Sequence, residues 1–168
     1  MPRTRDIGTF PVRIVSGGQS GVDRAALDFA IAHGIRYGGW CPKGGWAEDC
    51  PEPPGVLARY PDLRETPDRD PRQRTEWNVR DSDGTLILTR SSAVSPGTSV
   101  GIAAAQAHAK PHLIVDIDAP DAAKRIHAWL DANPGIQVLS IGGPRESETP
   151  GIYRTALSLL ETLLAPGA

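Results

Sequence analysis

The chain has 168 residues, of which 39% are hydrophobic, so its length suits one domain that can bury a core of its own. With 18 Lys and Arg residues against 20 Asp and Glu, the formal net charge is -2, which gives no general attraction to nucleic acid or to an anionic membrane. No segment resembles a signal peptide or is apolar for long enough to span a bilayer, so we expect a cytoplasmic protein with no nucleic-acid or membrane partner.

The first predicted strand and helix flank a glycine-rich turn. After a polar lead-in at residues 1–11, expected to be loosely ordered, residues 12–16 form an apolar run that passes directly into the turn. Glycines let backbone N–H groups approach a ligand, and the following helix points its N-terminus at the same place, so the turn predicts an anion site. The alternative is that the glycines only allow the strand and helix to pack closely. The predicted binding residues are Gly17, Gly18, Gln19, Ser20 and Gly21.

The spacing of these glycines matches neither the P-loop nor the dinucleotide-binding fingerprint. Ser20 is predicted to cap the helix, with Asp23 completing a motif close to a capping box, and Gly34 to end it. Asp23 is also a candidate binding residue, because its carboxylate either caps the helix or faces a ligand or cation.

A weaker second strand is predicted at residues 35–40, followed by a loop that contains Lys43 and Gly44. Lys43 lies where a parallel strand would end, and we predict that it offsets an anion shared with the first loop; an ordinary solvated lysine is the alternative. The C-x8-C spacing of Cys41 and Cys50 is not typical of zinc, so we expect two free thiols, with a disulfide or a soft-metal contact as the alternative.

Residues 50–73 are rich in Pro, Asp, Arg and Glu without periodicity, which predicts a long functional loop or lid, or disorder. Near its end, Arg69, Arg72 and Arg74 either reach an anion or form a solvated basic face. Three apolar side chains are expected to hold this loop to the body: Leu57, Tyr60 and Leu63.

The middle of the chain continues the alternation of elements. Thr75 is predicted to cap a helix at residues 76–82, and a clear strand follows at 85–89. A hydroxyl-rich turn then opens a helix of small apolar residues, which is either buried or packed against a second subunit. The predicted binding residues in this turn are Gly97, Thr98 and Ser99.

The last third predicts strands at residues 112–117 and 136–141, separated by an amphipathic helix that ends at residues 133–135. Arg145 follows the last strand as a candidate anion-binding residue, and Thr149 is predicted to cap the final helix with Pro150 at its first position.

Alternating strands and helices predict an α/β fold of the Rossmann-like, three-layer α/β/α type, with a mostly parallel sheet of about five strands. Residues 12–168 are expected to form this single domain. Ligands of such sheets lie beyond the carboxyl ends of the strands, and several of the predicted strands end in glycine-bearing loops.

A set of motifs spread over nearly the whole chain resembles the molybdenum carrier family. The motifs are Ser-Gly-Gly-Gln-Ser-Gly-Val-Asp at 16–23, Gly-Trp-Cys-Pro-Lys-Gly at 39–44, Asn-Val-Arg-Asp-Ser-Asp at 78–83, Pro-Gly-Thr at 96–98, Gly-Pro-Arg-Glu-Ser at 143–147 and Pro-Gly-Ile-Tyr at 150–153. The wider superfamily is similar to the lysine-decarboxylase-like, or Lonely Guy-type, phosphoribohydrolases and the DNA-processing protein A domain.

This resemblance implies a homo-oligomer with a pocket for a small phosphorylated ligand, which is molybdenum cofactor or molybdate in the family and a nucleotide in the wider superfamily. The phosphoribohydrolases carry a catalytic Glu three residues after the Thr of their glycine signature. Here that position, three residues after Thr98, is Gly101, which argues against hydrolysis by the same route.

Three functions follow from these observations. The first is a carrier that holds molybdenum cofactor, molybdate or a related phosphorylated ligand at its glycine loops, with Lys43 or Arg145 offsetting charge. The second is a nucleotide-processing enzyme in which carboxylates would act as general bases or hold Mg²⁺, although none is assigned as catalytic; the candidates are Asp23, Glu48, Asp49, Glu76, Asp81 and Asp83. The third is a nucleotide-binding sensor that acts through the segment at 50–73.

Overall fold

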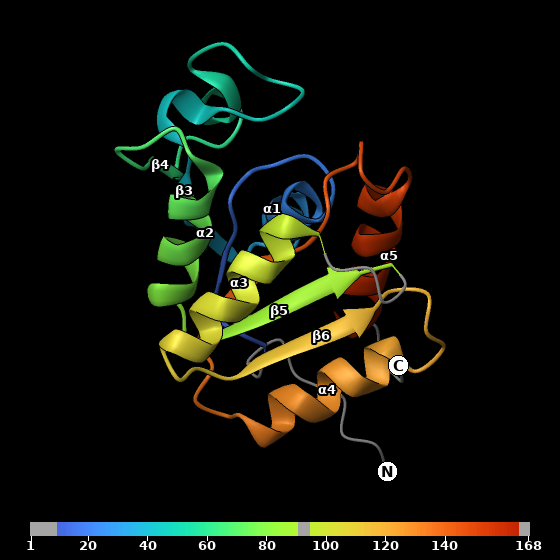
Figure 1. Ribbon diagram of the computed structural model, residues 1–168. Helices are drawn as coiled ribbons and strands as arrows, with labels where there is room; N and C mark the ends of the chain where they lie inside the picture. The colour runs from blue at the N-terminus through green and yellow to red at the C-terminus, as the bar shows by residue number, and fades with distance from the viewer. Residues whose placement is uncertain (1–9, 91–94, 165–168) are drawn as a thin grey trace.

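The computed structural model describes residues 10–90 and 95–164, which form a three-layer α/β/α sandwich (Figure 1). The central sheet has five parallel strands in the order β2-β1-β7-β5-β6. Their bounds are β1 Arg13–Val15, β2 Arg36–Gly38, β5 Gly84–Thr89, β6 His112–Asp116 and β7 Val138–Gly142. The predicted fold class, with a parallel sheet of five strands, is confirmed. Residues 1–9 of the expected lead-in and residues 91–94 of the hydroxyl-rich turn lie outside the described residues.

Three helices cover one face of the sheet and fill it with apolar side chains. These are α1 (Val22–Ala32), α4 (Ala122–Ala132) and α5 (Ile152–Leu164). Buried residues such as Phe29, Ile126 and Leu160 pack there against Leu86 and Leu88 of β5. Because the side chains of a strand alternate between its two faces, Thr85 and Ile87 point to the opposite side.

Two helices cover that opposite face, α2 (Pro71–Arg80) and α3 (Pro96–Ala107), and Figure 1 shows them side by side. The buried apolar cluster between them is small, with Val79, Ala104 and Ala105. α3 is not buried on every side, because Ala103 and Gln106 are exposed, so complete burial, one of its two predicted environments, is wrong.

The segment after β2 differs from its prediction. The expected strand at residues 35–40 is interrupted at Gly39, where φ is +118°, and β3 (Trp40–Cys41) pairs instead with β4 (Arg64–Glu65) in a separate two-stranded parallel sheet. Residues 50–73 therefore are not structureless: they contain the 3-10 turn Gly55–Ala58, then β4 and the start of α2. As predicted, Tyr60 and Leu63 are buried.

Three helix starts also differ from the prediction. Gly21, not Ser20, precedes α1, and no side chain caps that helix. α2 begins at Pro71, where the Asp70 side chain accepts the N–H of Arg72, so Thr75 lies inside the helix. α5 begins at Ile152, beyond the Thr149–Pro150 start expected from the sequence. In each case a different hydrogen bond or backbone geometry serves the helix start.

Candidate binding cleft

A cavity of about 80 Å³ lies between the sheet and helices α2 and α3, over the middle of β5 and β7, and it reaches the carboxyl ends of β1 and β7. We call it the inner cavity. Parallel α/β sheets bind ligands beyond the carboxyl ends of their strands, so the cavity lies only partly at the predicted position, at the ends of β1 and β7. Its lining includes Ser16, Gly17, Asp23, Arg74, Thr85, Gly97, Thr98, Gly101, Ser140 and Gly143.

The glycine loop meets protein atoms at three of its glycines. A Cβ on Gly17 would lie 1.9 Å from a guanidinium nitrogen of Arg74, and a Cβ on Gly18 would lie 3.1 Å from both Val56 and Leu63. A Cβ on Gly21 would lie 2.3 Å from the carbonyl oxygen of Pro144. These contacts favour the packing interpretation for Gly18 and Gly21, whereas Gly17 makes room for an arginine at the cavity wall.

Arg74 and Asp23 form a buried ion pair in the inner cavity. An Arg74 nitrogen lies 2.7 Å from Oδ2 of Asp23, and its Nε donates to the carbonyl oxygen of Pro71. Burial raises the pKa of Asp23 above its ordinary value, and the Arg74 guanidinium opposes that shift. The Gln19 N–H also lies 3.4 Å from Oδ2 of Asp23, so this carboxylate faces a cation of the protein and only weakly supports the helix start.

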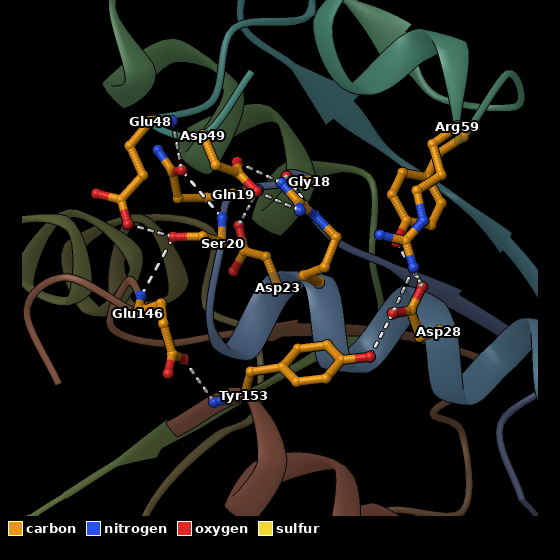
Figure 2. A network of polar contacts seen from close by, with 12 residues as sticks. Gly18, Gln19, Ser20, Asp23, Asp28, Glu48, Asp49, Arg59, Glu146 and Tyr153 are labelled. Atoms are coloured by element: carbon orange, nitrogen blue, oxygen red, sulfur yellow. Dashed lines mark hydrogen bonds and ion pairs between the residues drawn. The ribbon is translucent and has the colours of Figure 1, made fainter. Parts of the chain in front are cut away.

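Two buried polar atoms in this region have no hydrogen-bond partner among the described residues. They are the Nε2 of Gln19 and the Oγ1 of Thr85, in side chains that are only 4% and 3% exposed. The Oε1 of Gln19 accepts from the N–H groups of Ser20 and Glu48, which fixes the amide so that Nε2 is the donor left over (Figure 2). Buried donors are usually satisfied, so both atoms are suited to contact a ligand.

The first turn of α3 borders the same cavity. Ser95 precedes the helix and its Oγ accepts the N–H of Thr98 at 3.2 Å. Of the binding residues predicted in this turn, Gly97 and Thr98 line the inner cavity, whereas Ser99 does not line it and its side chain is exposed. The N-terminus of this 12-residue helix adds a partial positive charge at the cavity.

A second hollow of about 210 Å³ adjoins the inner cavity and shares Arg74, Thr75, Gly97 and Gly143 with it. We call it the mouth. Gln19, Arg72 and Arg145 also line it. Arg145 lies 3.4 Å from Glu148 and 4.0 Å from Glu48, and its guanidinium lies 5.8 Å from the centre of the Trp46 ring. The structure therefore brings Arg72 and Arg74 of α2 together with Arg145 of the loop after β7.

Lys43 and Gly44 lie elsewhere. They line a separate depression of about 430 Å³, here called the outer hollow, together with Trp46, Pro51, Glu52, Pro53, Arg69 and Pro71. Neither residue lines the inner cavity or the mouth, because the break at Gly39 takes the chain out of the main sheet before it reaches Lys43. Lys43 and the glycine loop therefore line different hollows, and the structure does not bring them together around one anion as we predicted.

A larger groove of about 980 Å³ runs past Ser20 and Gly21 toward α5. Most of its charged lining residues already bond to other protein groups, although Arg154 forms no ion pair with another described residue. Arg24 holds Asp49 at 2.8 Å, and Asp28 accepts hydrogen bonds from Tyr60, Tyr153 and Arg59 (Figure 2). This groove therefore has fewer unpaired groups to offer a ligand than the cleft beneath α2 and α3.

The described residues hold no group of three or more His, Cys, Asp or Glu side chains arranged to bind a metal ion. Cys41 and Cys50 are free thiols in this structure, and burial raises the pKa of Cys41 to about 11. No helix in the described part of the chain is long and apolar enough to cross a membrane.

Comparison with known proteins places these features in a family. The model of the circularly permutated YpsA SLOG family matches residues 14–164. Among solved structures, the chain is similar to a putative molybdenum carrier protein from Syntrophus aciditrophicus SB. The two are 45% identical over 92% of this chain and 96% of that chain, with a TM-score of 0.83. A search of curated proteins finds no match.

Proposed function

Because the chain belongs to the circularly permutated YpsA SLOG family, we propose that it binds and carries a small phosphorylated ligand at the inner cavity and its mouth. The name of the similar protein from Syntrophus supports molybdenum cofactor or molybdate as the cargo. Nucleotides are the alternative cargo, since they offer the same phosphate chemistry.

One observation carries this proposal: a buried amide donor, a helix N-terminus and arginines converge on one cleft. The amide is Nε2 of Gln19, the helix is α3, and Arg72 and Arg145 line the mouth beside them. Each of these groups donates hydrogen bonds or carries positive charge, so together they are complementary to a phosphate or molybdate oxyanion. Thr85 adds a hydroxyl without a partner deeper in the cleft.

The cleft favours binding over hydrolysis. Gly101, at the position of the catalytic Glu of the phosphoribohydrolases, lines the inner cavity and presents no side chain to it. The carboxylate of Asp23 is engaged with Arg74, which leaves it less available as a general base. Molybdenum cofactor would be held through its phosphate by the donors of the mouth, and the cofactor would supply its own metal.

We test the proposal by thermal unfolding with molybdate, extracted molybdenum cofactor, inorganic phosphate, ribose 5-phosphate and a nucleotide panel. A ligand at 100 times its Kd stabilises the protein by about 2.7 kcal/mol, enough to raise the midpoint by several degrees. We expect a shift with cofactor or molybdate that is reduced in Thr85→Val, which keeps the shape and removes the hydroxyl. A shift with nucleotides alone would identify the cargo as a nucleotide, and no shift with any of them would overturn the proposal.

We also propose that the carrier is cytoplasmic and homo-oligomeric. The half-exposed apolar residues of α3, Val100 and Ile102, support a subunit contact on this helix. Sedimentation of the purified protein measures the oligomeric state, and a monomer at all concentrations would contradict this part of the proposal.

A further inference from the structure

The outer hollow lies next to the mouth but is lined mostly by different side chains. Pro71 lines both depressions, and Arg145, which lines the mouth, lies over the ring of Trp46, which lines the outer hollow. A ligand that reaches from one to the other would therefore pass beside this arginine and tryptophan. With about 430 Å³, the outer hollow is in the range of small-molecule pockets.

The fold holds two cations on the wall of this hollow. The N–H of Lys43 donates to the carbonyl oxygen of Asp68 at 3.1 Å, and Oγ1 of Thr66 donates to that same oxygen at 2.9 Å. These bonds continue the pairing of β3 with β4 and tie the turn of Lys43 to the segment that carries Arg69. Both side chains are exposed, and neither forms an ion pair with another described residue.

The remaining lining residues give the hollow an aromatic surface, apolar walls and a carboxylate, which together suit a planar ring. Trp46 contributes an aromatic surface, and the prolines at positions 51, 53 and 71 contribute apolar walls. Lys43 and Arg69 donate hydrogen bonds and accept none, whereas the ionised carboxylate of Glu52 accepts only. Proteins that read a nucleobase combine stacking on an aromatic side chain with hydrogen bonds to the edge of the base.

We propose that the outer hollow binds a planar heteroaromatic ring that carries a carbonyl oxygen next to N–H groups. Trp46 stacks on the ring, Lys43 or Arg69 donates to the carbonyl oxygen, and Glu52 accepts from the N–H groups. The inference rests on the proposed function, because the phosphate of the same ligand occupies the mouth. Guanine and pterin rings both have this edge, whereas adenine lacks the carbonyl oxygen.

The inference is tested by calorimetric titration of the protein with GMP, AMP and ribose 5-phosphate. We expect GMP to bind about tenfold more tightly than AMP, and ribose 5-phosphate to bind more weakly than either. Trp46→Ala is expected to weaken GMP binding by about tenfold, the size of one lost stacking contact, and to weaken ribose 5-phosphate binding much less, because Trp46 reaches the mouth only through its contact with Arg145. Trp46→Phe keeps an aromatic ring and should recover most of the loss.

Two variants serve as matched controls. Trp77→Ala removes an aromatic side chain that packs on Trp40, outside the hollow, and Glu65→Gln removes an exposed carboxylate that does not line it. Neither should change the GMP affinity, whereas Glu52→Gln should abolish the preference for GMP over AMP. Guanosine and unphosphorylated pterin probe the hollow without the phosphate and show which of the two rings it prefers.

The outcomes separate this inference from the proposed function. If ribose 5-phosphate binds as tightly as GMP and Trp46→Ala changes neither, the ring site is wrong and the phosphate site stands. If no phosphorylated ligand binds, the proposed function fails, and the binding of guanosine and of unphosphorylated pterin is then the only test of the ring site. Absence of Trp46-dependent binding of those two rings would overturn the inference as well.

Discussion

The two faces of the sheet differ in what the strands present to the helices. Toward α1, α4 and α5, β5 presents Leu86 and Leu88, which are buried in the main core. Toward α2 and α3, the same strand presents Thr85, beside Ser140 of β7, at a polar cavity. One face therefore stabilises the fold and the other leaves room for a ligand, and the alternation of side chains along single strands produces both.

The largest effect on stability is expected on the face of the sheet that packs against α1, α4 and α5. Phe29→Ala should lower the free energy of unfolding by about 3–5 kcal/mol, because a fully buried aromatic ring that packs on Phe10 leaves a cavity. Urea unfolding measures the loss. Ile31→Ala on the same helix is the control, since Ile31 is 50% exposed and its truncation should cost about 0.5 kcal/mol or less. Equal losses would contradict the assignment of the core to this face.

The next effect concerns the buried ion pair on the cavity face. Asp23→Ala should cost about 3 kcal/mol, because it leaves the Arg74 guanidinium buried without its counter-charge. Adding Arg74→Met should recover much of that loss, so the double mutant would be more stable than Asp23→Ala. Asp118→Asn, which breaks the more exposed pair with Arg90, should cost under about 1 kcal/mol. A double mutant less stable than Asp23→Ala would count against a buried-charge penalty.

A smaller change of opposite sign is expected at Gly101. A Cβ there would meet its nearest neighbours at 3.7 and 3.8 Å, so alanine fits, and Gly→Ala inside a helix adds about 0.5–1 kcal/mol of stability. The same methyl group enters the inner cavity, so ligand binding should weaken while the fold becomes more stable. Gln106→Ala on the exposed side of α3 should leave binding unchanged. Binding unaffected by Gly101→Ala would place the ligand outside the inner cavity.

The smallest effect is a pH dependence of stability from two carboxylates of the groove that runs past Ser20 toward α5. The hydrogen bond from Arg24 holds the pKa of Asp49 below its ordinary value. Burial opposes the same shift at Glu48, but hydrogen bonds from Ser147 and Ser20 outweigh it, so the pKa of Glu48 is also lowered.

A carboxyl whose pKa is lower in the folded state stabilises the protein above its unfolded pKa of about 4, and this contribution is lost as pH falls through the folded value. Stability measured by urea unfolding should therefore fall between about pH 5 and pH 3. Asp49→Asn should make that fall shallower, by less than about 1 kcal/mol because Asp49 is half exposed. If stability falls with pH as steeply in this variant as in the unchanged protein, Asp49 does not contribute to the acid sensitivity.

The order of strands and helices was predictable because it depends on local patterns. Apolar runs such as residues 85–89 and the helix end at Gly34 agree with the structure, and so does the family resemblance. Helix starts were less predictable. Ser20 has the composition of a cap, but its hydroxyl donates to Glu48 instead, 28 residues away in the chain.

Hydrophobic periodicity and short motifs are properties of neighbouring residues, so the α/β class, the succession of elements and the family could be predicted from the sequence. Which charges meet in the cleft became apparent only from the packing of the folded chain. Arg74 contacts Asp23 across 51 positions, and Lys43 is turned away from the glycine loop by β3–β4 pairing. Such contacts depend on how distant segments pack, and no local pattern encodes them.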